Sequence, residues 1–187
     1  MPRHLLAISL LLVLGGCQTR PADPSTFGKA DIFGEGPLHI SGFDFPAHID
    51  GFRRVSLTEY DKAEDDFSVG YRHGHDALAT VVIYPANGHS LESEFAGCMN
   101  ALQQRHPDAN HLGNDSVALG AQAVLARRAS YRYSEFAGVN RADWRVDLLL
   151  MRRGGEFVEL RLSWPADSAL GPAAVGRFAQ DFVWPSA

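Results

Sequence analysis

The sequence predicts an α+β domain in which two helices pack on an antiparallel sheet, in the order strands, helix, three strands, helix. Three observations predict this class. Apolar and polar residues alternate with period two in several segments, as in strands that bury one face. Two segments, beginning near Leu91 and Pro172, instead repeat apolar residues every three or four positions, as helices do. Gly154 and Gly155 separate two alternating segments, which is typical of a tight hairpin turn.

The first strands are expected between Leu38 and Tyr84. Leu38–Arg54 places phenylalanines between Gly and Pro breaks, which favours a short strand and a turn that cover one end of the core. Val55–Tyr60 predicts another strand. Phe67–Arg72 alternates strictly, and the β-branched run Leu78–Tyr84 indicates a central strand buried on both faces. The polar residues His73–Asp76 between these two predict the turn of a hairpin.

A helix follows this hairpin. Ser90 is a candidate N-cap, and the acidic residues that come directly after it suit the positive end of a helix dipole. His106 and Pro107 predict the end of the helix. Cys98 falls on the apolar side and is expected to be a small buried residue in the helix–sheet interface. The residues 107–116 are predicted to be a polar loop.

Three strands and a helix complete the domain. The strands are expected over 123–133, 144–151 and 157–164, where one side of the alternation is apolar and the other is mostly polar. Pro172 suits the first position of the last helix. Ala174, Phe178 and Phe182 recur every fourth residue, so this side of the helix is expected to face the sheet.

The beginning of the chain has the pattern of an export signal. Arg3 precedes an apolar run from Leu5 to Leu14 that is too short to span a bilayer comfortably. The run ends in Leu14-Gly15-Gly16-Cys17, which resembles the motif of bacterial lipoprotein signals. The resemblance implies cleavage before Cys17, a diacylglyceryl group on its sulfur and acylation of the new amino end. This covalent lipid is the only non-protein group expected, and several acyl chains suffice for stable membrane anchoring.

The sequence therefore divides into three parts. Residues 1–16 are the predicted signal peptide, residues 17–37 the lipidated cysteine with a flexible tether rich in Pro, Gly, Asp and Ser, and residues 38–187 a single domain. Gln18 follows the cysteine, and the absence of Asp at that position resembles the lipoproteins sorted to the outer membrane. The expected location is the periplasmic side of the outer membrane.

The order of elements resembles the PsbP-like fold, including the DcrB-type bacterial lipoproteins. The resemblance rests on Phe45-Pro46 at the start, the strand Val81–Tyr84, the helix from Leu91 and the closing helix ending in Phe182. It covers nearly all of the predicted domain and rests on element order rather than on a diagnostic motif. The resemblance implies a scaffold for binding and assembly.

Charge and motifs limit the function classes. The chain of 187 residues has a formal net charge of -5, which argues against nucleic acid as a partner and against adhesion to anionic lipid through charge alone. The sequence contains no Gly-x-Ser-x-Gly elbow, Walker lysine or dinucleotide fingerprint. These observations favour a non-enzymatic envelope protein that binds a protein partner or a small ligand, while the enzyme question stays open.

One sheet face is a candidate protein-docking surface. Strand parity directs a set of arginines and apolar residues away from the expected core, a composition favoured at interfaces. The set consists of Arg128, Arg132, Arg145, Leu149, Met151 and Phe157. The alternative is an exposed lattice of cross-strand charge pairs, each of modest worth.

A metal-binding or hydrolytic envelope lipoprotein is the alternative function. His73, His75 and Asp76 occupy one predicted turn, and His89 follows the strand that this turn begins. Imidazole and carboxylate groups suit zinc, which requires three or four ligands in fixed geometry. This alternative requires the three histidines to converge.

Overall fold

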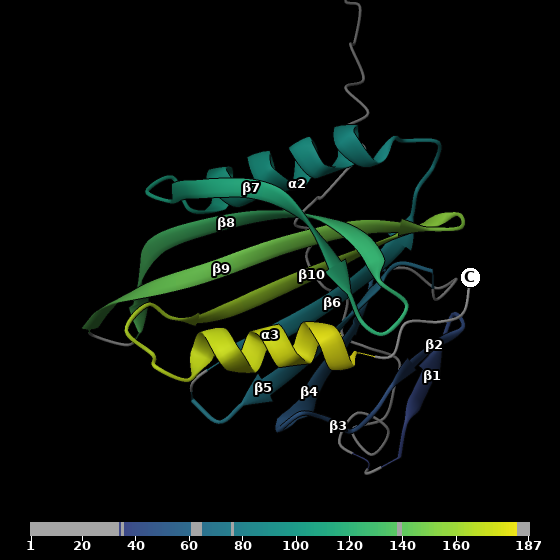
Figure 1. The fold of residues 1–187 in the computed structure, drawn as a ribbon, viewed down its shortest axis with the longest axis horizontal. Helices are drawn as coiled ribbons and strands as arrows, with labels where there is room; N and C mark the ends of the chain where they lie inside the picture. Colours follow the sequence, from purple (N-terminus) through teal and green to yellow (C-terminus); the bar gives the residue numbers. More distant parts are fainter. Residues whose placement is uncertain (1–33, 35, 61–64, 76, 138–139, 183–187) are drawn as a thin grey trace, which may run out of the picture.

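The computed structural model describes residues 34, 36–60, 65–75, 77–137 and 140–182. These residues form an eight-stranded antiparallel sheet, a separate two-stranded hairpin and two helices (Figure 1). The predicted α+β class is confirmed. Cys17, the predicted signal peptide and most of the predicted tether lie outside the described residues. Among the described helices, none combines the length and apolar character needed to cross a membrane.

The first half of the chain supplies the small hairpin and half of the large sheet. The strands are β1 (Leu38–Ile40), β2 (Phe43–Phe45), β3 (His48–Ile49), β4 (Phe52–Glu59), β5 (Phe67–His73) and β6 (Ala77–Pro85). β5 and β6 form the predicted hairpin, in register from Phe67 opposite Ile83 to His73 opposite Ala77. β6 is central as predicted, between β5 and β10. Its residues alternate between buried and half-buried, so only one of its faces is fully covered.

The second half supplies the other strands and the described helices. These elements are α2 (Leu91–Arg105), β7 (Asn110–Leu119), β8 (Val124–Ala137), β9 (Asn140–Arg153), β10 (Glu156–Pro165) and α3 (Gly171–Asp181). The sheet order is β3-β4-β5-β6-β10-β9-β8-β7. Four strands therefore follow α2, rather than the three predicted.

The additional strand is β7, and it corrects the prediction of a loop over 107–116. Asn110–Leu119 pairs with β8, from Asn110 opposite Arg132 to Leu119 opposite Val124. Asn110–Ser116 are mostly polar because both sides of this part of the edge strand face solvent, whereas Leu119 is buried. The backbone hydrogen bonds that hold β7 in place come from β8, and nothing in the local sequence reports that pairing.

The helix boundaries follow the predicted caps. Ser93 donates its backbone N–H to Ser90 Oγ at 3.2 Å, which caps the start of α2. The last turn ends at His106, whose N–H donates to the carbonyl of Leu102 at 2.9 Å. Cys98 is 2 % exposed, which confirms its predicted burial. At the start of α3 a Cβ added to Gly171 would lie 2.7 Å from Trp164, so only glycine fits this contact.

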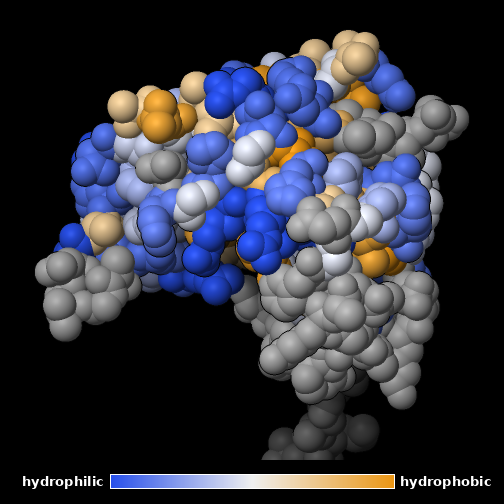
Figure 2. All heavy atoms as spheres, turned by 90° about the horizontal axis from the view of Figure 1, so that it is seen from below, coloured by the Kyte–Doolittle hydropathy of each residue, from blue (hydrophilic) through white to orange (hydrophobic). Residues whose placement is uncertain are grey.

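The two described helices cover opposite faces of the sheet (Figure 1), and each seals its own core. We call these the α3-side core and the α2-side core. The α3-side core contains the buried residues of α3, including Ala174, Phe178 and Phe182, with those of β5, β6 and β10. The α2-side core joins Phe95 and Cys98 to β8, β9 and Phe157 of β10. The face shown in Figure 2 is accordingly dominated by hydrophilic side chains and carries only small hydrophobic patches.

Three of the six residues predicted to form an exposed docking surface are buried instead. Leu149 is 3 % exposed, and both Met151 and Phe157 are fully buried. Leu149 and Met151 belong to the α3-side core, whereas Phe157 lies on the opposite face in the α2-side core. The docking prediction is therefore wrong for these three residues. The sequence placed all three on one face, but the register of β9 with β10 sets Met151 opposite Val158 and Phe157 opposite Arg152. Both faces carry a helix, so neither is an apolar surface open to solvent.

A buried arginine ties the start of the domain to the sheet. Arg54 on β4 is 2 % exposed, and its guanidinium donates to the backbone carbonyl of Phe45 on β2. It also donates to the carbonyls of Gly34 at 3.3 Å and Gly36 at 3.1 Å. These bonds give the buried guanidinium backbone carbonyls as acceptors. The last residues of the segment predicted to be a tether are thus held against the domain.

Candidate binding pocket

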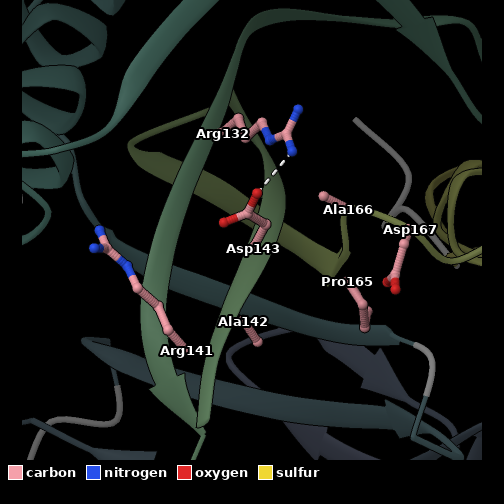
Figure 3. A pocket seen from close by; sticks show the side chains of 7 residues that line it. All are labelled: Arg132, Arg141, Ala142, Asp143, Pro165, Ala166 and Asp167. Atoms are coloured by element: carbon pink, nitrogen blue, oxygen red, sulfur yellow. Dashed lines mark hydrogen bonds and ion pairs between the residues drawn. The ribbon is translucent and has the colours of Figure 1, made fainter.

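A pocket of about 350 Å³ lies where the β8–β9 hairpin meets the segment between β10 and α3. Its lining, drawn in Figure 3, consists of Arg132, Arg141, Ala142, Asp143, Pro165, Ala166 and Asp167. Arg132 comes from β8 and the next three residues from β9. The last three come from the end of β10 and the residues after it. None of these seven lining residues is a Ser, Cys or His that could serve as a nucleophile or imidazole base.

Backbone pairing holds the two walls of the pocket together. β10 runs beside β9 until Pro165, which lies opposite Trp144. The N–H of Ala166 then donates to the carbonyl of Asp143 at 2.8 Å, so the chain leaving β10 stays against β9. β9 is in turn paired with β8, with Asp143 opposite Ser134, and this pairing continues to Asn140 opposite Ala137. The pocket is therefore built on paired strands, which fixes its charged side chains more firmly than a free loop would.

The polar lining carries both signs of charge. Arg132 Nη2 donates to Asp143 Oδ2 at 2.7 Å, and Ser134 Oγ donates to Asp143 Oδ1 at 2.5 Å. The hydrogen bond from Ser134 has the largest effect and that from Arg132 the next, and together they hold the pKa of Asp143 below its ordinary value. In Figure 3 Arg132 and Asp143 point toward each other, while Asp167 lies across from them on the other wall. A ligand with both cationic and anionic groups, or a single charged group, could exchange with this exposed pair.

Charge pairs continue beyond the pocket on the same sheet face. Arg128 donates to both carboxylate oxygens of Asp115 at 2.9 and 2.6 Å, and Ser130 Oγ donates to Asp147 Oδ1 at 2.5 Å. The predicted residues Arg128, Arg132 and Arg145 do share this face, since each lies on the α3 side of its strand. Arg132 alone among them lines the pocket. The alternative prediction for this face was a lattice of exposed cross-strand charge pairs. The ion pairs Arg128–Asp115 and Arg132–Asp143 are of this kind.

Asp147 lies in this lattice and gives a prediction about pH. Burial raises its pKa above the ordinary value of 3.8, despite the hydrogen bond from Ser130 and the nearby arginines. Ionisation of Asp147 therefore lowers the free energy of unfolding. This loss of stability is absent below pH 3.8 and develops as pH rises through the folded-state pKa. Asp147→Asn keeps an oxygen for Ser130, so we expect it to stabilise the fold at pH 7 by up to about 1 kcal/mol. Urea unfolding between pH 7 and pH 4.5 should show this gain shrinking as pH falls.

Asp115→Asn is the matched control for this prediction. The hydrogen bond from Arg128 lowers the pKa of Asp115, so its ionised form stabilises the fold above 3.8 and that contribution is lost as pH falls. This variant should therefore be slightly less stable than the wild type at pH 7. A destabilising effect of Asp147→Asn at pH 7 would show that the arginines, rather than burial, dominate at Asp147.

A second polar cluster is buried beneath α2. Tyr84 donates to Glu94 Oε1 at 3.1 Å, and its Oη lies 3.5 Å from Cys98 Sγ. Glu159 is 1 % exposed and forms an ion pair with Arg161. Burial raises the pKa of Tyr84, and the charges of Glu159 and Glu94 add to the effect, so its hydroxyl remains a proton donor. The cluster hydrogen-bonds polar groups within the α2–sheet interface, as buried polar groups require.

Sequence reasoning did not find this cluster. The negative charge of Glu94 was consistent with the first turn of the helix, but the sequence did not predict that its side chain is buried. The position of α2 over the sheet decides that burial.

The three histidines of the metal alternative are not brought together. His73 ends β5 and lies against Phe52, with ring centroids 5.2 Å apart. His89 follows the other end of β6, where its Nδ1 lies 3.2 Å from Glu94 Oε2. The nine residues of β6 separate the two ends by about 30 Å. Among the described residues no group of three or more His, Cys, Asp or Glu is placed to hold a metal ion.

Most of the pocket lining was not identified from the sequence. Arg141 and Asp143 continue the polar side of β9 that also holds Arg145, so extending the alternation toward the start of the strand could have found them. Asp167 could not be found this way, because its position depends on the return of β10 beside β9. Comparison of the sequence with protein-family models and with curated proteins finds no match.

Proposed function

We propose that this chain is a non-enzymatic, lipid-anchored protein of the bacterial cell envelope that binds a charged small ligand, or a charged group of a protein partner, in the pocket at Arg132 and Asp143. The anchoring part rests on Leu14-Gly15-Gly16-Cys17 and its resemblance to lipoprotein signals. The resemblance of the sequence to PsbP-like domains supports a binding scaffold, with four strands rather than the predicted three after α2. On this proposal the domain stands at the periplasmic side of the outer membrane.

The observation that carries the binding role is the mixed charge of a pocket built on paired strands. The Arg132 and Asp143 side chains are 49 % and 44 % exposed, so a ligand can reach both without unfolding the site. An exposed ion pair contributes little to the stability of the fold, so a ligand can replace one of its members at a small cost in free energy. The lining residues lack a nucleophile with a base, so binding rather than group transfer is the role that they support.

Purification of the intact lipoprotein from membranes tests this proposal. Arg132→Gln with Asp143→Asn removes both charges while preserving shape and net charge. We expect molecules that co-purify with the wild type, identified by mass spectrometry, to be depleted at least about tenfold from this double variant, because charge-assisted bonds are lost. The measurement compares their amounts per mole of purified chain.

The control is the pair Arg127 and Glu92, which are joined at 2.5 Å on the α2 side of the molecule. Arg127→Gln with Glu92→Gln removes an equivalent charge pair away from the pocket and should leave the co-purified molecules unchanged. Equal depletion by both double variants, or by neither, would exclude the pocket as the binding site.

A further inference from the structure

Four of the residues that line the pocket are charged, and three of them have a partner of opposite charge. Arg132 and Asp143 pair with each other at 2.7 Å, and Arg141 pairs with Asp108 at 3.0 Å. The fourth is Asp167, whose side chain forms no ion pair and no hydrogen bond with the residues that the structure describes. The charge that the lining leaves uncompensated is therefore one carboxylate.

Backbone hydrogen bonds on both sides of Asp167 fix its place in the pocket wall. The N–H of Ala166 donates to β9 at 2.8 Å. The N–H of Ser168 donates to the carbonyl of Pro165 at 2.9 Å, which closes a turn that contains Asp167. Ser168 Oγ in turn accepts the N–H of Gly171 at 2.9 Å, at the start of α3. The backbone that carries the carboxylate is thus ordered before a ligand arrives, which lowers the entropy lost on binding.

The rest of the lining is small and apolar. It consists of Ala142, Pro165 and Ala166, which are all half-buried. In Figure 3 Asp167 lies across the pocket from Asp143. A carboxylate beside apolar groups suits an organic cation, because it binds the charged end while the carbon chain contacts the apolar surface. The volume of about 350 Å³ fits a small molecule or a single long side chain.

The arginine beside the pocket does not reverse this preference for a cation. Arg145 lies outside the lining, opposite Arg132 of β8. Asp143 and Asp147 lie two residues before and after it on β9, on the same face of the strand. The charge of Arg145 is therefore flanked by two carboxylates. The formal net charge of -5 on the whole chain also favours the approach of a cation.

We infer that the pocket binds an organic cation, an ammonium or guanidinium group on a short aliphatic chain, and that Asp167 determines this specificity. The inference rests on the proposed function, since it names the ligand class of the same pocket. Asp143 stays paired with Arg132, whereas Asp167 supplies carboxylate oxygens that are free to accept hydrogen bonds. A free amine and a lysine side chain of a protein partner share this chemistry, and the test separates them.

The test follows the backbone amide signals of the isotope-labelled full-length chain by NMR at pH 7, in detergent if the chain is lipidated. The probes are putrescine, N-acetyl-lysine amide and acetate. We expect both amines, but not acetate, to shift the signals of Ala142, Ala166 and Asp167. Asp167→Asn should raise the dissociation constants of both amines roughly fivefold, because one carboxylate–ammonium pair is lost. Tighter binding of putrescine identifies a free amine as the ligand, and tighter binding of the capped lysine identifies a protein side chain.

Asp181→Asn is the matched control. Asp181 is exposed at the opposite end of α3 from the pocket, and its substitution removes the same charge. It should leave the binding of both amines unchanged. Equal weakening by Asp167→Asn and Asp181→Asn, or the absence of a shift with either amine, overturns the inference.

The failure of this inference is distinguishable from the failure of the proposed function. If acetate rather than the amines shifts the pocket signals, and Arg132→Gln with Asp143→Asn abolishes that shift, the pocket binds an anion. The inference then fails while the proposed function stands. The proposed function itself fails only if that double variant does not deplete the co-purified molecules more than its control does.

Discussion

Met151→Glu is expected to cost the domain about 3–5 kcal/mol, close to the full stability of many domains, because a buried carboxylate without a cation is strongly unfavourable. Met151 is fully buried in the α3-side core. It lies opposite Val158 of β10, a residue of the same core. We expect the variant to be largely unfolded at 25 °C and pH 7. Urea titration followed by circular dichroism measures the change.

Met151→Leu is the matched control, since it keeps the apolar character and nearly the same volume. It should cost less than about 1.5 kcal/mol. Phe157→Ser should also be strongly destabilising, because Phe157 is fully buried in the α2-side core. A wild-type urea midpoint for the Met151→Glu variant would contradict the burial of this residue beneath α3.

Cys17→Ser is expected to release most of the protein from membranes. The acyl chains proposed for Cys17 are the only anchor that we assign to the chain, and one missing thiol removes the attachment point for the first of them. Fractionation of cells after an alkaline wash, together with metabolic labelling by a fatty-acid analogue, measures both consequences. The label should be absent from the variant and present in the wild type.

Thr19→Ser provides the control for this substitution, because it makes a comparably small change two residues beyond the cysteine. It should remain labelled and membrane-bound. If Cys17→Ser withstands the wash in the membrane fraction, or if the wild type incorporates no label, the lipoprotein part of the proposed function fails.

Local patterns were sufficient for the elements whose structure depends on neighbouring residues. The alternation through β9 and β10 and the glycine pair between them predicted that hairpin, because side chains two apart share a face of a strand. Ser90 predicted the start of α2, because the cap is a bond between residues three apart in sequence. The spacing of Ala174, Phe178 and Phe182 predicted the buried side of α3 in the same way.

The site required information that local patterns lack. Arg132 was selected for its face of the sheet, but its pocket forms only where Asp143 and Asp167 arrive from separate parts of the chain. His89 was grouped with His73 because both adjoin β6, yet a strand of nine residues holds its two ends apart. In each case the decisive quantity is a distance between segments, which residue types and short spacings do not specify.

By itself, the sequence determined the export signal pattern, the α+β class, and most strand and helix boundaries. Tertiary structure alone decided that Leu149 and Met151 face α3 while Phe157 faces α2, and that Asn110–Leu119 is a strand. The physical reason is the range of the interactions. Periodicity and capping act between residues a few positions apart, whereas the burial of a face and the pairing of a polar edge strand depend on segments brought together only by folding.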